Sequence, residues 1–314
     1  MAPDTEPPRR VNLWNVAKAT VREYAKGDKF TLGAALSFYM VFSLAPMLVL
    51  VIAVAGLAFG QQAVEGHLGE QIEGLVGKEG ALEVETMVKG AAQAQKSTWA
   101  AVVSTVLLMV GATSVFMQLR KSLNIVWEVR LRNKVGFLKV FIDRIFSFGM
   151  VVCLGFLLLV SLVAHAALVG LAAHIEEYIP PGGLPLISGL EIAISFGLTT
   201  LLFAIIYKFM SDAKVRWRDA VVGAVFTAFL FNVGKYAIGT YLGQTRVVDT
   251  FGVAGSVVVL LLWVYYSSQI VFFGAEFTQA YAAERGTDIV PGRHAVRLMH
   301  VDDDGAAVPP AAAK

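Results

Sequence analysis

Six long stretches of apolar residues alternate with polar segments along this chain of 314 residues. Each stretch is long enough to cross a lipid bilayer as a helix, for which about 20 apolar residues are needed. The stretches are residues 31–59, 99–119, 145–173, 186–209, 220–242 and 251–285. The pattern predicts an all-α, polytopic membrane protein with six transmembrane helices. In the first stretch, Pro46 is expected to kink the helix, and Gly33 and Ser37 form a small face for close helix approach.

Two polar parts of the chain carry apolar residues at helical spacing and are predicted to form amphipathic helices. In the N-terminal segment, residues 1–30, the apolar stripe consists of Leu13, Val16, Ala17, Thr20, Val21 and Tyr24. Such a helix either lies in the membrane interface or packs on cytoplasmic loops. The second part, about 60–98, is expected to form one or two helices on the periplasmic side. Residues 31–283 are then the membrane domain, and residues 284–314 are a cytoplasmic tail that is expected to be largely disordered.

Charge supports the membrane class and predicts an orientation. Charged residues make up 16% of the chain, against about 25% in a soluble domain. Lys and Arg gather in the N-terminal segment, in the loops after the second and fourth stretches, and in the tail, whereas the intervening loops carry few. Because Lys and Arg are enriched on the cytoplasmic side, both termini are predicted to lie in the cytoplasm.

The basic loop after the second stretch interleaves cations with Leu123, Val126 and Trp127 at helical spacing. A surface helix of this kind contacts anionic lipid headgroups. The predicted headgroup contacts are Arg120, Lys121, Trp127, Arg130 and Arg132. The orientation bias already explains the charge, so membrane lipids are expected as partners and nucleic acid is not.

Ionisable groups inside the apolar stretches are costly and are therefore candidates for function. With a rise of 1.5 Å per residue, His165, Glu191 and Lys235 lie about 7 to 12 Å from the outer ends of their stretches. We hypothesise that Lys235 and Glu191 form an ion pair with His165 nearby, facing a polar cavity open to the periplasm, with Asn232 as a further lining residue. Alternatively, Lys235 extends to the headgroups and Glu191 lies in the interface.

Glu276 lies near the cytoplasmic end of the last stretch, too far from Lys235 to pair with it. At helical spacing it shares a stripe with Gln269 and with Phe272 or Phe273. The stripe either lines a cavity that opens to the cytoplasm, or it bonds to neighbouring spans and holds the bundle together. We prefer the second interpretation, because a carboxylate near the interface costs little.

Several long blocks of the sequence resemble the YihY/BrkB family of bacterial inner-membrane proteins. They include TLGAALSFYMVFSLAPMLVL, GATSVFMQLRKSLNIVWEV, VRWRDAVVGAVFTAFLFNVGKYAIGTYLG and GVAGSVVVLLLWVYYSSQIVFFGAEFTQAYA, and together they cover about residues 30–283. The resemblance implies a six-helix protein of the cytoplasmic membrane and implies no settled activity. Many members carry Pro-Asn after the fourth span, where this chain has Met210, Ser211 and Asp212.

Members of that family have often carried the label ribonuclease BN, which the residues of this chain argue against. A zinc-dependent nuclease needs clustered His and Asp ligands, and the five His are dispersed along the chain. We therefore expect no enzymatic activity, no cofactor and no metal. The preferred function is transport of a lipid, a lipid-linked envelope precursor or another amphipathic solute through a polar cavity. The alternative is a scaffold or partner-binding protein of the cell envelope, and a homo-oligomer is left open.

Overall fold

The computed structural model describes residues 11–43, 98–131, 184–244, 255–292 and 295–298, with short pieces at 82, 85–86, 149, 300–301 and 307–308. Pro46 and nearly all of the third predicted span and of the predicted periplasmic insertion lie outside these residues.

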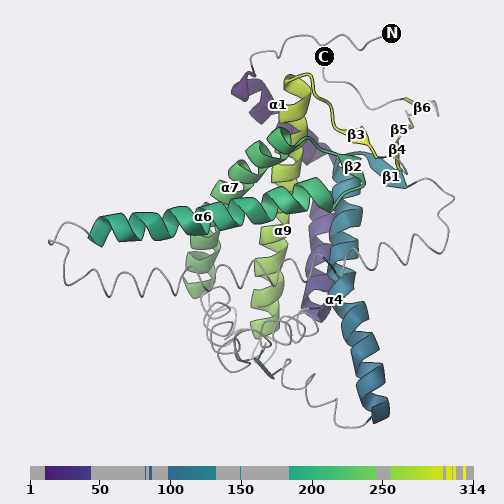
Figure 1. Cartoon of the computed structure of the whole chain (residues 1–314), viewed down its shortest axis with the longest axis vertical. Coiled ribbons are helices and arrows are strands. Elements are labelled where there is room, and N and C mark those ends of the chain that lie inside the picture. The colour runs from purple at the N-terminus through teal and green to yellow at the C-terminus, as the bar shows by residue number, and fades with distance from the viewer. Residues whose placement is uncertain are drawn as a thin grey trace.

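Long helices dominate the described residues and match the predicted stretches (Figure 1). Residues 29–43 form the start of the first predicted span. The other helices are α1 (Leu13–Lys26), α4 (Thr98–Val126), α6 (Leu184–Phe209), α7 (Trp217–Gln244) and α9 (Gly255–Glu284). This confirms the all-α membrane class, while the number of spans stays a prediction.

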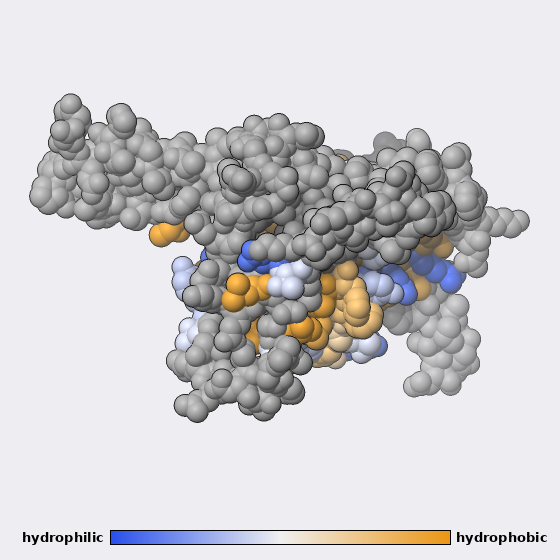
Figure 2. Space-filling view, turned by 90° about the horizontal axis from the view of Figure 1, so that it is seen from below, coloured by the Kyte–Doolittle hydropathy of each residue, from blue (hydrophilic) through white to orange (hydrophobic). Residues whose placement is uncertain are grey.

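Three of the described helices are long and apolar enough to cross a membrane, through Ile192–Phe209, Trp217–Ile238 and Val257–Glu284. Only 22% to 39% of the residues in these segments are buried inside the chain. Seen from below, the described surface is mostly hydrophobic with hydrophilic residues at its margins (Figure 2). Apolar surface on this scale is suited to hydrocarbon rather than to water.

Helices α6, α7 and α9 pack in sequence order, and α1 and α4 pack on α9. In Figure 1, α6 lies across the direction of α4 and α9. Tyr207 of α6 is fully buried at the contact of all three helices, where its hydroxyl donates to the carbonyl of Val271 at 2.8 Å and lies 2.9 Å from the hydroxyl of Thr227. Because a buried hydroxyl must find partners, these bonds fix how the three helices pack.

Short antiparallel strands join the polar segments at one end of the helices (Figure 1). β1 (Val129–Leu131) follows α4 and pairs with β4 (Ala295–Arg297). β2 (Ala213–Lys214) follows α6 and pairs with β3 (Val290–Pro291). A third pair joins β5 (His300–Val301) and β6 (Ala307–Val308). The segments predicted to share the cytoplasmic side therefore meet at one end of the fold.

Residues 285–292 and 295–298, at the beginning of the predicted tail, bond back to the rest of the fold. Gly286 ends α9 with φ of 75°, and Thr287 N–H donates to the carbonyl of Ala282 at 2.8 Å, which is the common glycine stop of a helix. The buried carboxylate of Asp219, in the first turn of α7, then accepts from Arg285 and from Thr287, both at 3.1 Å. Local composition gave no signal of these long-range partners.

Candidate functional site

Four polar side chains meet where α1, the start of the first span and the C-terminal half of α9 come together. They are Tyr24, Lys29, Gln269 and Glu276, and we call them the polar cluster. Its centre is an ion pair with 2.8 Å between Nζ of Lys29 and Oε1 of Glu276. The two side chains are 11% and 4% exposed, and the Lys29 ammonium also donates to the carbonyl of Glu23 at 2.8 Å.

Helix α1 supplies Tyr24 because one face of this helix packs on α9. Val16 and Thr20 are buried one turn apart, and Tyr24 follows at the same helical spacing. The helix begins at Asn12, whose side chain accepts from the backbone N–H of Trp14 at 3.0 Å. Trp14 is 76% exposed on the opposite face. The helix thus packs on a span rather than on loops, and it keeps an apolar surface suited to a membrane interface.

The predicted stripe on α9 faces this helix. The Tyr24 ring lies edge-on to the ring of Phe273, with centroids 5.2 Å apart, and the Tyr24 hydroxyl donates to Oε1 of Gln269. Glu276 completes the stripe and pairs with Lys29. This agrees with the preferred interpretation of Glu276 as a carboxylate bonded to a neighbouring span.

Close packing brings the start of the first span against Gln269. Gly33 lies so near Gln269 that a Cβ at this position would collide with the Gln269 amide, as expected for a small face that allows close approach. Nε2 of Gln269 is buried and has no hydrogen-bond partner in the part of the chain that the structure describes. A buried amide donor left unpaired is costly, so this N–H group is available to donate to an acceptor on a ligand.

Burial also changes the chemistry of Tyr24, which lies outside the membrane-spanning segments. Desolvation raises the pKa of Tyr24 to about 12, and the nearby Tyr265 and Glu276 add to the rise. The hydroxyl is therefore protonated at neutral pH and serves as a hydrogen-bond donor. The cluster holds an ion pair and hydroxyl and amide groups, and among the described residues no group of His, Cys, Asp or Glu could hold a metal ion.

The other predicted cavity residues are not brought together by the described contacts. The Lys235 ammonium lies 5.7 Å from the centroid of the Tyr236 ring. Asn232 donates to the carbonyl of Ala228 in its own helix at 2.8 Å, so its amide is used within α7. His165 and the side chain of Glu191 lie outside the described residues, and the Lys235–Glu191 pair stays a prediction.

The predicted headgroup contacts of the first basic loop need correction. Trp127 is 2% exposed, and its indole N–H donates to the carbonyl of Ala275 at 3.1 Å, so it anchors α4 on α9 instead of facing lipid. Arg120 forms a fork with the carboxylate of Asp212, at 2.6 and 3.2 Å. Lys121 and Arg130 are exposed, and their headgroup contact stays a prediction. Arg132 lies outside the described residues.

Asp212 is a residue whose importance the sequence did not indicate. Its carboxylate also accepts from the Asn124 amide at 2.7 Å. The Asn124 carbonyl oxygen in turn accepts from the Asp212 backbone N–H and the Ser211 hydroxyl, each at 2.8 Å. The segment that departs from the family's Pro-Asn pattern therefore locks the end of α6 onto α4.

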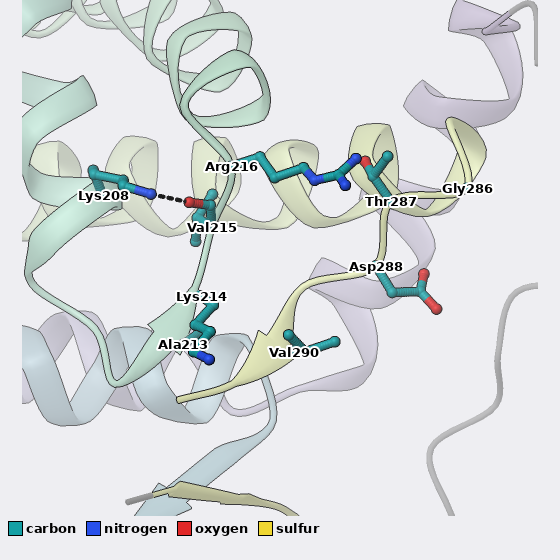
Figure 3. Close-up of a pocket in the computed structure, with 9 residues that line it drawn as sticks. All are labelled: Lys208, Ala213, Lys214, Val215, Arg216, Gly286, Thr287, Asp288 and Val290. Atoms are coloured by element: carbon teal, nitrogen blue, oxygen red, sulfur yellow. Dashed lines mark hydrogen bonds between the residues drawn. The ribbon is translucent and has the colours of Figure 1, made fainter. Parts of the chain in front are cut away.

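The second basic segment borders a cavity of 730 Å³ that the sequence did not predict. The cavity is lined by Lys208, Ala213, Lys214, Val215, Arg216, Gly286, Thr287, Asp288 and Val290. Figure 3 shows Lys208 directed at the carbonyl of Val215 and the Arg216 guanidinium near Thr287. In the sequence these cations indicate only the orientation of the chain in the membrane. No pattern in the neighbouring residues indicates that residues 286–290 fold back over them.

Comparisons with known proteins agree with the membrane class. A family model described as Virulence factor BrkB matches residues 20–298. A UPF0761 membrane protein of Pseudomonas aeruginosa is 30% identical over 250 residues, which cover 77% of this chain and 56% of that protein. Another from Verminephrobacter eiseniae is 26% identical over 286 residues, covering 87% of this chain and 65% of that relative. A third, from Alteromonas mediterranea, is 33% identical over 173 residues, covering 54% and 55%.

The chain thus spans between 55% and 65% of the length of these relatives. No solved structure matches it.

Proposed function

Since the chain belongs to the BrkB family of membrane proteins, we propose that it is a multi-pass protein of the bacterial cytoplasmic membrane that moves an amphipathic lipid or lipid-linked envelope precursor. In this proposal it is a transporter and not an enzyme. The polar cluster lines the path at the cytoplasmic end, and both termini lie on that side. The meeting of the basic segments at one end of the fold supports this orientation.

The observation that carries the proposal is the buried Lys29–Glu276 pair beside Nε2 of Gln269, which has no hydrogen-bond partner among the described residues. Replacing a buried ion pair with apolar residues of similar volume is often neutral or stabilising, so stability alone gives little reason to keep it. Ionisable groups in membrane segments instead mark the paths of polar substrates. A lipid headgroup is such a substrate, and the exposed apolar faces of the helices suit its acyl chains.

A second candidate is a scaffold of the cell envelope that moves nothing. The pairing of the buried polar groups with one another favours it: Lys29 with Glu276, Tyr24 with Gln269, and Arg120 with Asp212. A static protein satisfies its buried polar groups internally. The two candidates therefore differ in whether the polar cluster opens.

Reconstitution into liposomes separates the two candidates. A fluorescent phospholipid is placed in both leaflets, and a membrane-impermeant reagent added outside destroys the fluorescence of the outer leaflet. In protein-free liposomes the inner-leaflet lipid stays protected. If the protein moves lipid, the inner-leaflet lipid is expected to reach the outer leaflet and to lose its fluorescence as well. Transport also predicts that Gln269→Leu slows the exposure of inner-leaflet lipid. A scaffold predicts that the inner-leaflet fraction stays protected with every form of the protein.

A further inference from the structure

The basic cavity next to the start of α7 has an excess of positive charge. Three of its lining residues are cationic, Lys208, Lys214 and Arg216, and one is acidic, Asp288. In Figure 3 the carboxylate of Asp288 points away from Lys208 and Val215. Lys214 and Arg216 are exposed and form no salt bridge with any residue that the structure describes. Their charge is thus available to an anion.

One cation is held in place beside an aromatic residue. The Lys208 ammonium donates to the carbonyl of Val215 and lies 5.6 Å from the centroid of the Trp217 ring. Phe209 packs edge-on against the same ring, with centroids 5.6 Å apart. Trp217 is nevertheless 50% exposed. An exposed Trp beside cations at the end of an apolar helix is typical of the level of lipid headgroups.

An apolar surface leads away from this position along α7. Every third or fourth residue of the helix is an exposed apolar side chain, and 58% of Phe229 is exposed. The stripe consists of Trp217, Val221, Val225, Phe229, Val233 and Tyr236. Residues four apart are neighbours on the helix surface, so the stripe is continuous, but it winds round α7 by about 160° between Trp217 and Val233. It lies in a segment long and apolar enough to span a membrane.

A second hollow, of 560 Å³, connects the charge to the stripe. It is lined by residues from the start of α7 and from the end of α9, namely Trp217, Arg218, Val221, Val222, Tyr281 and Arg285. Arg285 is paired with Asp219, so Arg218 adds a further cation at the beginning of the stripe. Charge and apolar surface are therefore continuous around Trp217.

We propose that the start of α7 is a binding site for an anionic phospholipid, with the phosphate between Lys208, Lys214 and Arg216 and an acyl chain along the α7 stripe from Trp217. Basic pockets at the cytoplasmic ends of membrane helices bind such headgroups. A soluble phosphate uses the cations alone and leaves the adjoining stripe unexplained, which is why the lipid is the occupant. The site requires no lipid movement, so this proposal can be tested independently of the proposed transport.

Quenching of Trp217 by brominated lipids tests the site in nanodiscs that contain the full chain. The Trp217 signal is the difference between the unchanged protein and Trp217→Phe. A small fraction of phosphatidylglycerol with brominated chains, in a phosphatidylcholine background, is expected to quench this signal more than the same fraction of brominated phosphatidylcholine. The variant Lys214→Gln/Arg216→Gln changes two exposed side chains. Each lost cation should weaken the preference for phosphatidylglycerol over phosphatidylcholine by about fivefold.

The matched control is Lys18→Gln/Lys26→Gln, which removes the same charge from exposed positions of α1. It is expected to keep the preference for phosphatidylglycerol. The proposal is overturned if the two double variants lose the preference equally, or if the unchanged protein shows none. It is also overturned if inorganic phosphate displaces the lipid more than chloride of equal ionic strength does, since the site then belongs to a soluble anion.

Discussion

Lys29 and Glu276 come from opposite ends of the sequence and form a buried ion pair, with 2.8 Å between Nζ and Oε1. The pair joins the beginning of the first span to the last described span, and the docked α1 lies beside it through Tyr24 and Gln269. A charge in this place needs its partner, because removal of one side leaves the other buried and uncompensated.

Glu276→Gln is therefore expected to destabilise the protein by about 3 kcal/mol, and Lys29→Met by a similar amount. Combining Lys29→Met with Glu276→Leu should recover most of the loss, since no charge then stays buried. Denaturant unfolding in mixed micelles measures all three variants. Lys26→Met, at an exposed position of the same segment, should change stability by less than about 0.5 kcal/mol. Additive losses in the double variant would contradict the pairing.

The Asp212 fork gives a second prediction about stability. Asp212→Asn keeps the shape of the side chain but removes the negative charge that the largely buried Arg120 contacts. We expect a loss of about 2 to 3 kcal/mol, measured by unfolding in micelles. Asp288→Asn is the control, because Asp288 is exposed at the same end of the fold. Equal effects of the two substitutions would show that Asp212 does not lock α6 onto α4.

The raised pKa of Tyr24 predicts a loss of stability in alkali. A tyrosine ordinarily titrates near pH 10, and burial raises the pKa of Tyr24 to about 12. The folded state thus favours the neutral phenol. The stabilisation is complete below pH 10 and is lost as the pH rises towards 12. Proteolytic release of α1 should accelerate in this window, and it should accelerate less in Tyr24→Phe. Identical pH profiles of the two proteins would contradict the buried position of Tyr24.

The end of α9 can be tested at a single glycine. Gly286 has φ of 75°, where a Cβ is unfavourable, so Gly286→Ala should cost about 1 kcal/mol. Gly197→Ala, inside α6 and with open space around its Cβ position, should instead be neutral or stabilising by up to about 1 kcal/mol. Thermal unfolding compares the two variants, and a stabilising Gly286→Ala would rule out the proposed turn.

Helices were predictable from the sequence because their signal is local. Long apolar runs with few charges gave α6, α7 and α9, with ends within a few residues of those observed. The spacing of Val16, Thr20 and Tyr24 gave α1. The stripe of Gln269 and Glu276 was likewise found from the period of a helix.

The bonding partners of the polar side chains were not predictable, because these bonds join segments that are distant in the sequence. Lys29 was counted only as a flanking cation, although it neutralises Glu276. Trp127 has the spacing of a surface helix, but the indole N–H finds a carbonyl on α9 and the ring is buried. The pairing of β3 with β2 and of β4 with β1, and the contact of Arg285 with Asp219 of α7, bring the residues after α9 back over the basic segment and form the basic cavity.

The movement of lipid by the Lys29→Met/Glu276→Leu variant in liposomes tests the central claim most directly. This variant is expected to stay folded with most of the stability of the unchanged protein, because its polar pair is replaced by apolar side chains. If the pair lines the path of a headgroup, inner-leaflet lipid should become accessible no faster than in protein-free liposomes. Unchanged lipid movement in the folded variant would show that the polar cluster is not part of a transport path.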